Sequence, residues 1–242
     1  MNDVTSLPAY AFAASPCGGL AMRLGGSEVV MRASGALWLG AERALVVADL
    51  HLEKGSSYAA RGQMLPPYDT RETLKRLAAE VAVLEPAAVV LLGDTFHDRK
   101  SEARLAREDA EQLRGLAAGR RLIWVIGNHD ADGPQRLPGE TADELTLAGL
   151  TLRHEPLAGP RPGEVAGHLH PAALVRAPRG SVRRRCFVTD GERAILPAFG
   201  AYAGGLNVRD TAFAGMFVRA PLAATVGPTR VRAIGWRQLA GD

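Results

Sequence analysis

Three short apolar runs in the first half of the chain are each followed at once by carboxylate, amide or imidazole side chains. The runs span residues 44–48, 87–92 and 122–126, and their richness in Val, Ile or Leu predicts buried strands. The polar residues come next, as Asp49-Leu50-His51, Gly93-Asp94 and Gly127-Asn128-His129-Asp130. In open parallel sheets ligands bind beyond the carboxyl ends of the strands, so these side chains should meet at one rim.

Two stretches between these runs predict helices. Residues 70–84 carry apolar side chains at helical spacing, and Asp69 and Glu72 suit a capping box at the start of that helix. Residues 101–118 form the second predicted helix, with Gly119 as its terminator. The first half of the chain therefore predicts the order β-α-β-α-β.

Short strand-like pieces replace the helical pattern after residue 130. They span residues 144–147, 150–153, 164–166, 173–176, 183–188 and 193–196. Asp190-Gly191 separates the last two and is a strong hairpin signal. His154 follows one of these pieces and Gly167-His168-Leu169-His170 follows another, so five strand ends would deliver polar groups to the same rim.

The composition fits one globular domain. The chain has 242 residues, of which 47% are hydrophobic and 23% charged. We expect residues 26–242 to form a single domain and residues 1–25, rich in Ala and Gly without periodicity, to form a loosely ordered N-terminal segment. Since no apolar run reaches membrane-spanning length and the first residues do not resemble a secretory signal, we expect no membrane partner and a cytoplasmic location.

Cysteine and charge limit the partners. Cys17 and Cys186 belong to no Cys-x-x-Cys pair, so any metal must be held by oxygen and imidazole. The formal net charge of +3 is weak support for a nucleic-acid partner. The run Arg183 to Arg185 could contact phosphates, but a solvated strand edge that discourages sheet pairing is the favoured interpretation.

The histidines indicate a metal site. Five of the six lie at the predicted strand ends, and His97 follows Asp94 by three positions. Alternate spacing, as in Asp49-x-His51 and His168-x-His170, puts both side chains on one face if the backbone is extended. The candidate ligands are Asp49, His51, Asp94, Asn128, His154, His168 and His170.

This ligand set predicts two divalent ions. Imidazole, carboxylate and amide oxygen together suit manganese, iron or zinc. Seven ligands are too many for one ion, so two ions roughly 3.5 to 4 Å apart are expected, with Asp94 as the bridge. Taken alone, Asp49 or Asn128 would be an ordinary turn residue and His154 a structural one, but five motifs in this order favour the metal site. Asp98 and Asp130 receive no role, since either could cap or hold its neighbours.

The order of the motifs resembles the calcineurin-like metallophosphoesterases, whose signature runs D-x-H, GD, GNH(D/E), H and GH-x-H. The match is complete from Asp49 to His170. The resemblance implies an α/β fold, a four-layer α-β-β-α sandwich of two mixed sheets flanked by helices. It implies one metal held by Asp49, His51, Asp94 and His170, and another held by Asp94, Asn128, His154 and His168. It also implies that His129 is the catalytic histidine, with His97 orienting His129 or the phosphate.

Finer features resemble a bacterial ligase-associated group, PdeM, over residues 27–210. They are the stretches 45–52, 167–171 and 196–200. Members of that group are described as DNA-damage-response endonucleases encoded near an ATP-dependent DNA ligase, a helicase and an exonuclease. The stretch from Gly93 to His97 resembles the nuclease branch of the superfamily, where GD-x-F-H carries a histidine. The resemblance implies two Mn²⁺ ions, with Fe, Zn, Ni or Co as alternatives.

Three functions follow as hypotheses. The first is a dinuclear-metal phosphodiesterase that hydrolyses DNA, with a phosphate ester as substrate. The second is a hydrolase of small phosphorylated metabolites, such as nucleotides or nucleotide-sugar diphosphates. The third is a non-catalytic scaffold of the same fold, against which the complete ligand set argues. Residues 197–205 form either a loop over the site or a plain packing turn.

Overall fold

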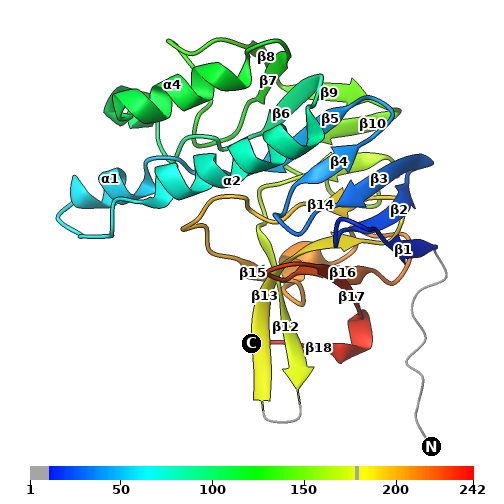
Figure 1. Ribbon diagram of the computed structural model, residues 1–242. Helices are drawn as coiled ribbons and strands as arrows, with labels where there is room; N and C mark the ends of the chain where they lie inside the picture. The colour runs from blue at the N-terminus through cyan, green and yellow to red at the C-terminus, as the bar shows by residue number, and fades with distance from the viewer. Residues whose placement is uncertain (1–10, 178–179) are drawn as a thin grey trace, which may run out of the picture.

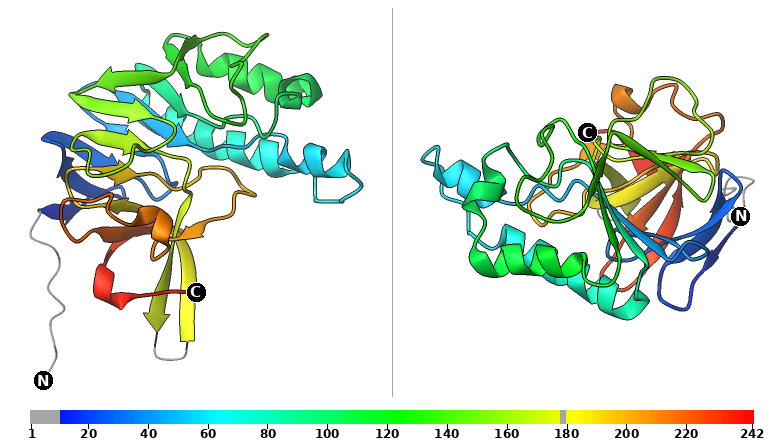
Figure 2. Two further views of the ribbon diagram at one scale, coloured as in Figure 1. Left: turned by 180° about the vertical axis from the view of Figure 1, so that it is seen from behind. Right: turned by 90° about the horizontal axis from the view of Figure 1, so that it is seen from above.

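Two mixed β-sheets pack face to face, and α-helices cover the outer face of the first (Figure 1). The structure is a computed structural model that describes residues 11–177 and 180–242. The views from behind and from above show the helices gathered along one side of the sandwich (Figure 2). The predicted α/β fold with two mixed sheets is confirmed.

The first sheet has eight strands in chain order. They are β1 (Phe12–Ala14), β2 (Leu20–Leu24), β3 (Ser27–Met31), β4 (Leu37–Leu39), β5 (Ala44–Ala48), β6 (Ala88–Leu92), β7 (Arg121–Val125) and β8 (Glu140–Ala142). Strands β1 to β5 pair antiparallel, whereas β5 to β8 are parallel. The carboxyl ends of β5, β6 and β7 therefore meet at one edge, as the polar residues after the apolar runs predicted.

The second sheet is built from the rest of the chain. Its strands are β9 (Glu144–Leu147), β10 (Leu150–Arg153), β11 (Glu164–Ala166), β12 (Pro171–Ala177), β13 (Gly180–Thr189), β14 (Ala194–Ile195), β15 (Leu206–Asn207), β16 (Leu222–Val226), β17 (Val231–Gly235) and β18 (Leu239–Ala240). Strands β10, β11 and β14 are parallel neighbours, so β10 and β11 also end on one side. Strands β13 and β14 form the antiparallel hairpin that Asp190-Gly191 predicted.

Helices follow the predicted order with two corrections. They are α1 (Lys54–Ala59), α2 (Asp69–Leu84), α3 (Ser101–Arg104) and α4 (Arg107–Leu116). The helix predicted over residues 101–118 is broken, because Leu105 and Ala106 take extended ψ angles of 131° and 149°. The capping box is also wrong: Asp69 is the first helical residue, and its carboxylate accepts a hydrogen bond from Gly55 N instead.

Three apolar clusters hold the layers together. One lies between the two sheets, and a second lies between the first sheet and the face of α2 and α4 that carries Leu77 and Leu113. The third covers the outer face of the second sheet and includes Phe213 of the 3-10 helix η1 (Thr211–Phe213) and Trp236 of η2 (Trp236–Gln238). In the described residues, short turns rather than α-helices thus make up the fourth layer.

The N-terminal segment differs from its expectation where it is described. From residue 11 onward it contributes β1 and β2, and Leu20, Met22 and Leu24 are buried on alternate positions of β2. The alternation is that of a half-buried strand, and its shortness hid it in the sequence. Residues 1–10 lie outside the described residues. The extent of a single domain over residues 26–242 stays a prediction.

None of the helices in the described residues combines the length and the apolar character that crossing a membrane needs.

A buried ion pair in the second sheet joins Arg193 to Glu164. Arg193, 1% exposed, donates to Glu164 and to the backbone carbonyls of Leu157, Gly159 and Met216. One side chain thus ties two loops, that between β10 and β11 and that before β16, to the sheet.

Replacing Arg193 with alanine should destabilise the protein by about 3 kcal/mol, because it leaves Glu164 Oε1 and three backbone carbonyls without their donor, while Arg153 Nε stays 3.4 Å from Glu164 Oε2. The matched control is Arg121→Ala, which breaks the Arg121–Glu140 pair, in which both side chains are 56% exposed. That change should cost at most about 1 kcal/mol. Urea unfolding measures both, and equal losses would contradict the structural role of Arg193.

Candidate metal centre

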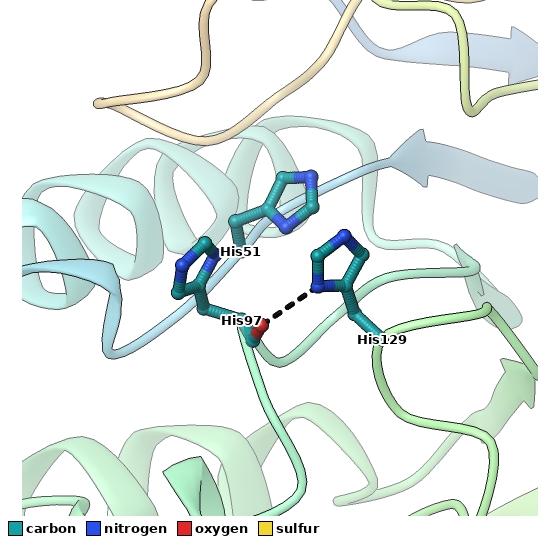
Figure 3. Close-up of side chains that lie close together, drawn as sticks. All are labelled: His51, His97 and His129. Carbon is teal, nitrogen blue, oxygen red and sulfur yellow. Dashed lines mark hydrogen bonds between the residues drawn. The ribbon is translucent and has the colours of Figure 1, made fainter. Parts of the chain in front are cut away.

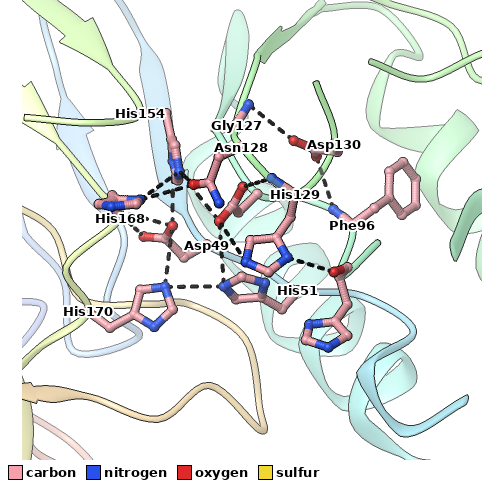
Figure 4. Close-up of polar contacts among 12 residues, drawn as sticks. Asp49, His51, Phe96, Gly127, Asn128, His129, Asp130, His154, His168 and His170 are labelled. Carbon is pink, nitrogen blue, oxygen red and sulfur yellow. Dashed lines mark hydrogen bonds and ion pairs between the residues drawn. The ribbon is translucent and has the colours of Figure 1, made fainter. Parts of the chain in front are cut away.

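All seven candidate ligands converge on one edge of the sandwich (Figure 4). Asp49 and His51 follow β5, Asp94 follows β6, and Asn128 follows β7. The second sheet supplies the rest from the ends of β10 and β11, as His154, His168 and His170. Side chains 121 residues apart in sequence thus share one site because their strands end on the same side.

The ligand atoms form two groups. Asp49, His51 and His170 offer atoms that all lie within 4.8 Å of one another, and so do Asp94, His154 and His168. The Asp94 carboxylate lies between the groups, with its Oδ2 3.9 Å from His51 Nε2 and 3.4 Å from His154 Nε2. Two adjacent clusters joined by one carboxylate are consistent with a dinuclear metal site.

Asn128 belongs to the second group. Its Oδ1 lies 2.9 Å from His154 Nε2 and 3.1 Å from His168 Nδ1. The two imidazole nitrogens are themselves 3.2 Å apart. The amide oxygen and both rings therefore point at a shared position rather than at separate partners.

The arrangement of these groups fits divalent cations. Asp49 and Asp94 are 0% and 2% exposed, so two carboxylates are buried side by side. His51 Nε2 faces His170 Nε2 at 3.1 Å, and two ring nitrogens at that distance need a proton or a cation between their lone pairs. The backbone N–H groups of His168 and His129 donate to these carboxylates, but two adjacent buried negative charges are costly unless positive charge neutralises them.

The protonation states also suit metal binding. Burial, reinforced by His170, lowers the pKa of His51 to about 3, so its imidazole is neutral and keeps a lone pair for a metal. Burial would raise the pKa of Asp94, but the hydrogen bond and the charge of His154 outweigh it and lower that pKa to about 2. The carboxylate is therefore ionised throughout the physiological range.

His129 stands at the border of this centre (Figure 3). Its Nδ1 lies 2.9 Å from the backbone carbonyl of His97, and since a carbonyl only accepts, Nδ1 carries the proton. Its Nε2 then remains free and lies 4.0 Å from Asp94 Oδ2. The side chain is 42% exposed, so the free nitrogen is open to a substrate.

His97 acts on His129 through its backbone. The two rings are stacked with centroids 5.6 Å apart and an interplanar angle of 20°, but the hydrogen bond comes from the carbonyl of His97. The ligand atoms of His51, His97 and His129 also lie within 4.8 Å of one another. Burial, together with the charge of Lys54, lowers the pKa of His97, so its ring is neutral at pH 7.

Comparison with known proteins decides the family. A family model described as calcineurin-like phosphoesterase matches residues 42–181, more than half of the chain. The chain belongs to the calcineurin-like phosphoesterase family. It is therefore a metal-dependent phosphoesterase, a hydrolase whose substrate is a phosphate ester.

Two solved structures extend the comparison. The crystal structure of the nuclease MPE from Pseudomonas putida is 30% identical with a TM-score of 0.70, and the match covers 89% of this chain and 100% of that one. The phosphoesterase YfcE from E. coli is 16% identical with a TM-score of 0.40, over 79% of this chain and 98% of that one. No curated protein sequence matches the chain.

The backbone of this phosphoesterase is left-handed at most of the candidate ligands. Positive φ angles occur at Asp49 (53°), His51 (45°), Asp94 (44°), His168 (68°) and His170 (46°). The expectation of extended backbone at the two alternate pairs is therefore wrong, although their side chains do meet. Each such conformation costs on the order of 1–3 kcal/mol in a non-glycine residue, and such strain gathers at functional sites.

Neighbouring loops hold these strained conformations. His51 N donates to the carbonyl of Asp94 at 2.9 Å, and Asp49 N donates to that of Gly93 at 3.2 Å. His168 N donates to Asp49 Oδ2 at 2.9 Å, which links the loops of the two sheets. Each loop therefore fixes the next one, and the ligands are pre-organised by the backbone.

Glycine is required where two ligand loops touch. Gly93 has a φ of 74°, and a Cβ built on it would lie 2.1 Å from His154 Nδ1. Gly127 and Gly167 have ordinary φ angles, but a Cβ there would lie 2.2 Å from Asp94 Oδ1 and 2.6 Å from Asp49 Oδ2. The backbone thus comes close to a ligand side chain at all three glycines, and it takes a left-handed turn only at Gly93.

Asp130, left without a role by the sequence, organises two loops. Its Oδ2 accepts from Phe96 N and its Oδ1 from Gly127 N, each at 3.1 Å, so the loops after β6 and β7 share one carboxylate. Asp98 is paired with Arg104 at 2.8 Å. Asp130 and Asp98 therefore hold neighbouring segments in place. The sequence could not reveal these roles, because they depend on the tertiary structure.

The middle of residues 197–205 is a packing turn, one of the two interpretations given to this segment. Phe199 is buried, its N–H donates to the carbonyl of Ala48, and Gly200 N donates to that of Asp49, so this part is a packing turn beneath the ligands. Beyond it, the Tyr202 hydroxyl donates to the carbonyl of Pro66. Helix α1 was not predicted, and its Tyr58 ring lies 6.0 Å from that of His97.

Gly93→Ala should lower the affinity for Mn²⁺ by at least about tenfold, the scale of disturbing the residues that support metal ligands. The new methyl group would displace His154 from the position it shares with Asp94. Isothermal titration calorimetry measures the affinity. The control is Gly115→Ala in α4, where a Cβ meets nothing within 4 Å. Equal Mn²⁺ affinity in both variants would show that the contact between Gly93 and His154 does not shape the site.

Proposed function

We propose that this phosphoesterase is a phosphodiesterase that cleaves DNA and belongs to the ligase-associated PdeM group. The observation that carries the proposal is the match to a nuclease over 89% of this chain and 100% of that one. The histidine of the GD-x-F-H stretch, His97, supports it, because this residue stacks on His129 at the edge of the metal centre. A cytoplasmic location and a functional association with an ATP-dependent DNA ligase, a helicase and an exonuclease are parts of the same proposal.

Two Mn²⁺ ions are the proposed cofactors. One would be held by Asp49, His51, Asp94 and His170, and the other by Asp94, Asn128, His154 and His168. The position of Asp94 between the two groups supports its role as the bridge. The mixture of imidazole, carboxylate and amide oxygen suits manganese, and iron, zinc, nickel or cobalt would also be accepted by such ligands.

The chemistry expected here is hydrolysis of a phosphodiester by in-line displacement. Bound divalent ions supply an activated water and neutralise charge on the phosphate oxygens. His129 is proposed as the catalytic residue: in its imidazolium form, with Nδ1–H held by the carbonyl of His97, it would give the proton on Nε2 to the departing oxygen and return to the neutral Nδ1–H form. His97 is proposed as a positioning residue that fixes the orientation of the His129 ring.

His129→Asn should lower kcat by about 10²–10⁴-fold, the usual contribution of a general acid, and leave two Mn²⁺ per chain. Asp94→Asn should lose metal as well as turnover, because it removes the charge shared by both groups. Metal content by inductively coupled plasma mass spectrometry and turnover of bis-p-nitrophenyl phosphate separate the two roles. Equal metal loss in both variants would contradict this division.

A substrate panel tests the proposed function. Purified protein with Mn²⁺ is assayed on bis-p-nitrophenyl phosphate, p-nitrophenyl phosphate, single- and double-stranded DNA, nucleotides and a nucleotide-sugar diphosphate. We expect turnover of the diester and of DNA. Strong monoesterase or pyrophosphatase turnover without cleavage of DNA would displace the nuclease proposal in favour of a small phosphorylated metabolite.

A further inference from the structure

A concentration of positive charge lies outside the metal centre. A cleft of about 790 Å³ is lined by residues of α2, of β13 and of the turn at 226–229, and none of the candidate metal ligands is among them. Four arginines line it, Arg76 from α2 and Arg183, Arg184 and Arg185 from β13. The carboxylate in its lining, Glu80, already pairs with Arg32 at 2.7 Å.

The two inner arginines have no carboxylate partner within 4 Å in the described part of the chain. Arg185 donates from Nη1 to the carbonyl of Ala198 at 3.1 Å and from Nη2 to that of Ser34 at 2.9 Å. Arg76 donates to the carbonyl of Phe199, and its buried Nε has no hydrogen-bond partner among the described residues. Burial, together with the charge of Arg76, lowers the pKa of Arg185 to about 10. Two half-buried cations thus repel each other, and a bound anion would relieve that repulsion.

The outer arginines differ in what holds them. Arg183 pairs with Asp242 at 2.8 Å and also donates to the carbonyl of Gly205. Arg184 is exposed, its Nη1 donates to the carbonyl of Arg183, and no carboxylate lies within 4 Å of it in the described residues. These residues were expected to form a solvated edge, but Arg185 turns inward, and Arg184 remains available to a ligand.

The cleft is connected to the metal centre through one segment of backbone. Arg76 and Arg185 bind the carbonyls of Phe199 and Ala198, and the next residue, Gly200, donates to the carbonyl of Asp49. The arginines and the ligand loop therefore flank the same stretch of chain. A ligand with several phosphates could occupy both places, because phosphates of one nucleic-acid strand repeat about every 3.4 Å along the axis of a duplex.

We propose that this arginine cleft binds a backbone phosphate of the nucleic acid whose scissile phosphodiester lies at the metal centre. The proposal rests on the proposed nuclease function. Guanidinium groups bind phosphate through paired hydrogen bonds, and four of them around a cleft with one engaged carboxylate suit a polyanion. A free phosphate compound would be bound by the same guanidinium groups, and the test below distinguishes it from a nucleic acid.

The test uses Mn²⁺-loaded protein in the His129→Asn background, so that a fluorescent oligonucleotide is bound but cleaved slowly. Arg184→Gln should weaken oligonucleotide binding about five- to eightfold at 0.1 M salt, the loss expected for one phosphate contact, and lower the salt slope of log K by about 1. Arg76→Gln should act in the same direction. Turnover of bis-p-nitrophenyl phosphate by Arg184→Gln in the active protein should stay unchanged, because this small diester occupies the metal centre alone.

The matched control is Arg176→Gln, which removes the same charge from the exposed face of β12, the hairpin partner of β13, outside the cleft lining. Equal loss of affinity in Arg176→Gln and Arg184→Gln would overturn a specific site in favour of diffuse attraction. Unchanged affinity in Arg184→Gln, with DNA still cleaved by the active protein, would overturn the cleft proposal alone. Absence of any oligonucleotide binding or cleavage would instead remove the nuclease function on which it rests.

Competition with inorganic phosphate distinguishes a nucleic acid from a free phosphate compound as the ligand of the cleft. In the proposal, millimolar phosphate competes with the oligonucleotide only weakly, because several contacts hold the strand at once. Tight binding of phosphate that Arg184→Gln abolishes, with unchanged oligonucleotide affinity, would overturn the nucleic-acid source and assign the cleft to a free phosphate compound. Thermal melting of each variant verifies that the fold is retained.

Discussion

Two buried carboxylates, Asp49 and Asp94, facing imidazole nitrogens from both sheets are the interaction on which the structure of the site depends. Carboxylates that are 0% and 2% exposed are costly to bury unless positive charge compensates them. Among the nearby imidazoles, His51 is neutral; burial would lower the pKa of His154, but its hydrogen bond to Asp94 and the charge of Asp49 outweigh it and raise that pKa. One imidazolium compensates only part of the charge of two carboxylates, and bound cations would compensate the rest. The left-handed backbone at five ligands and the close contact at Gly93 are consequences of crowding these groups together.

The pairing of the strands brings the ligand loops together. Parallel pairing of β5, β6 and β7 brings three ligand loops to one edge, and the parallel pair β10 and β11 brings two more from the opposing sheet. The core between the sheets fixes their distance, and hydrogen bonds such as that from His168 N to Asp49 tie the loops across the gap. The convergence of the candidate ligands at the interface of two sheets thus depends on packing far from them.

Much of this could be predicted from the sequence, because residue type and position after an apolar run are local signals. The strands at 44–48, 144–147, 150–153 and 164–166 have the predicted bounds, and all seven candidate ligands meet. The backbone angles of Asp49 and His51 could not be predicted, since they depend on hydrogen bonds to the loop after β6. Three further features could not be predicted, because they depend on contacts between distant segments. They are the action of His97 through its carbonyl, the role of Asp130 between two loops and the inward turn of Arg185. No glycine or proline lies at the break between α3 and α4, so the sequence did not indicate it.

The central claim is that two cations share Asp94, and anomalous diffraction from crystals grown with Mn²⁺ measures this most directly. The account predicts two anomalous peaks roughly 3.5–4 Å apart, with the carboxylate of Asp94 reaching both. A single peak, or two peaks of which only one lies within bonding distance of Asp94, would contradict it.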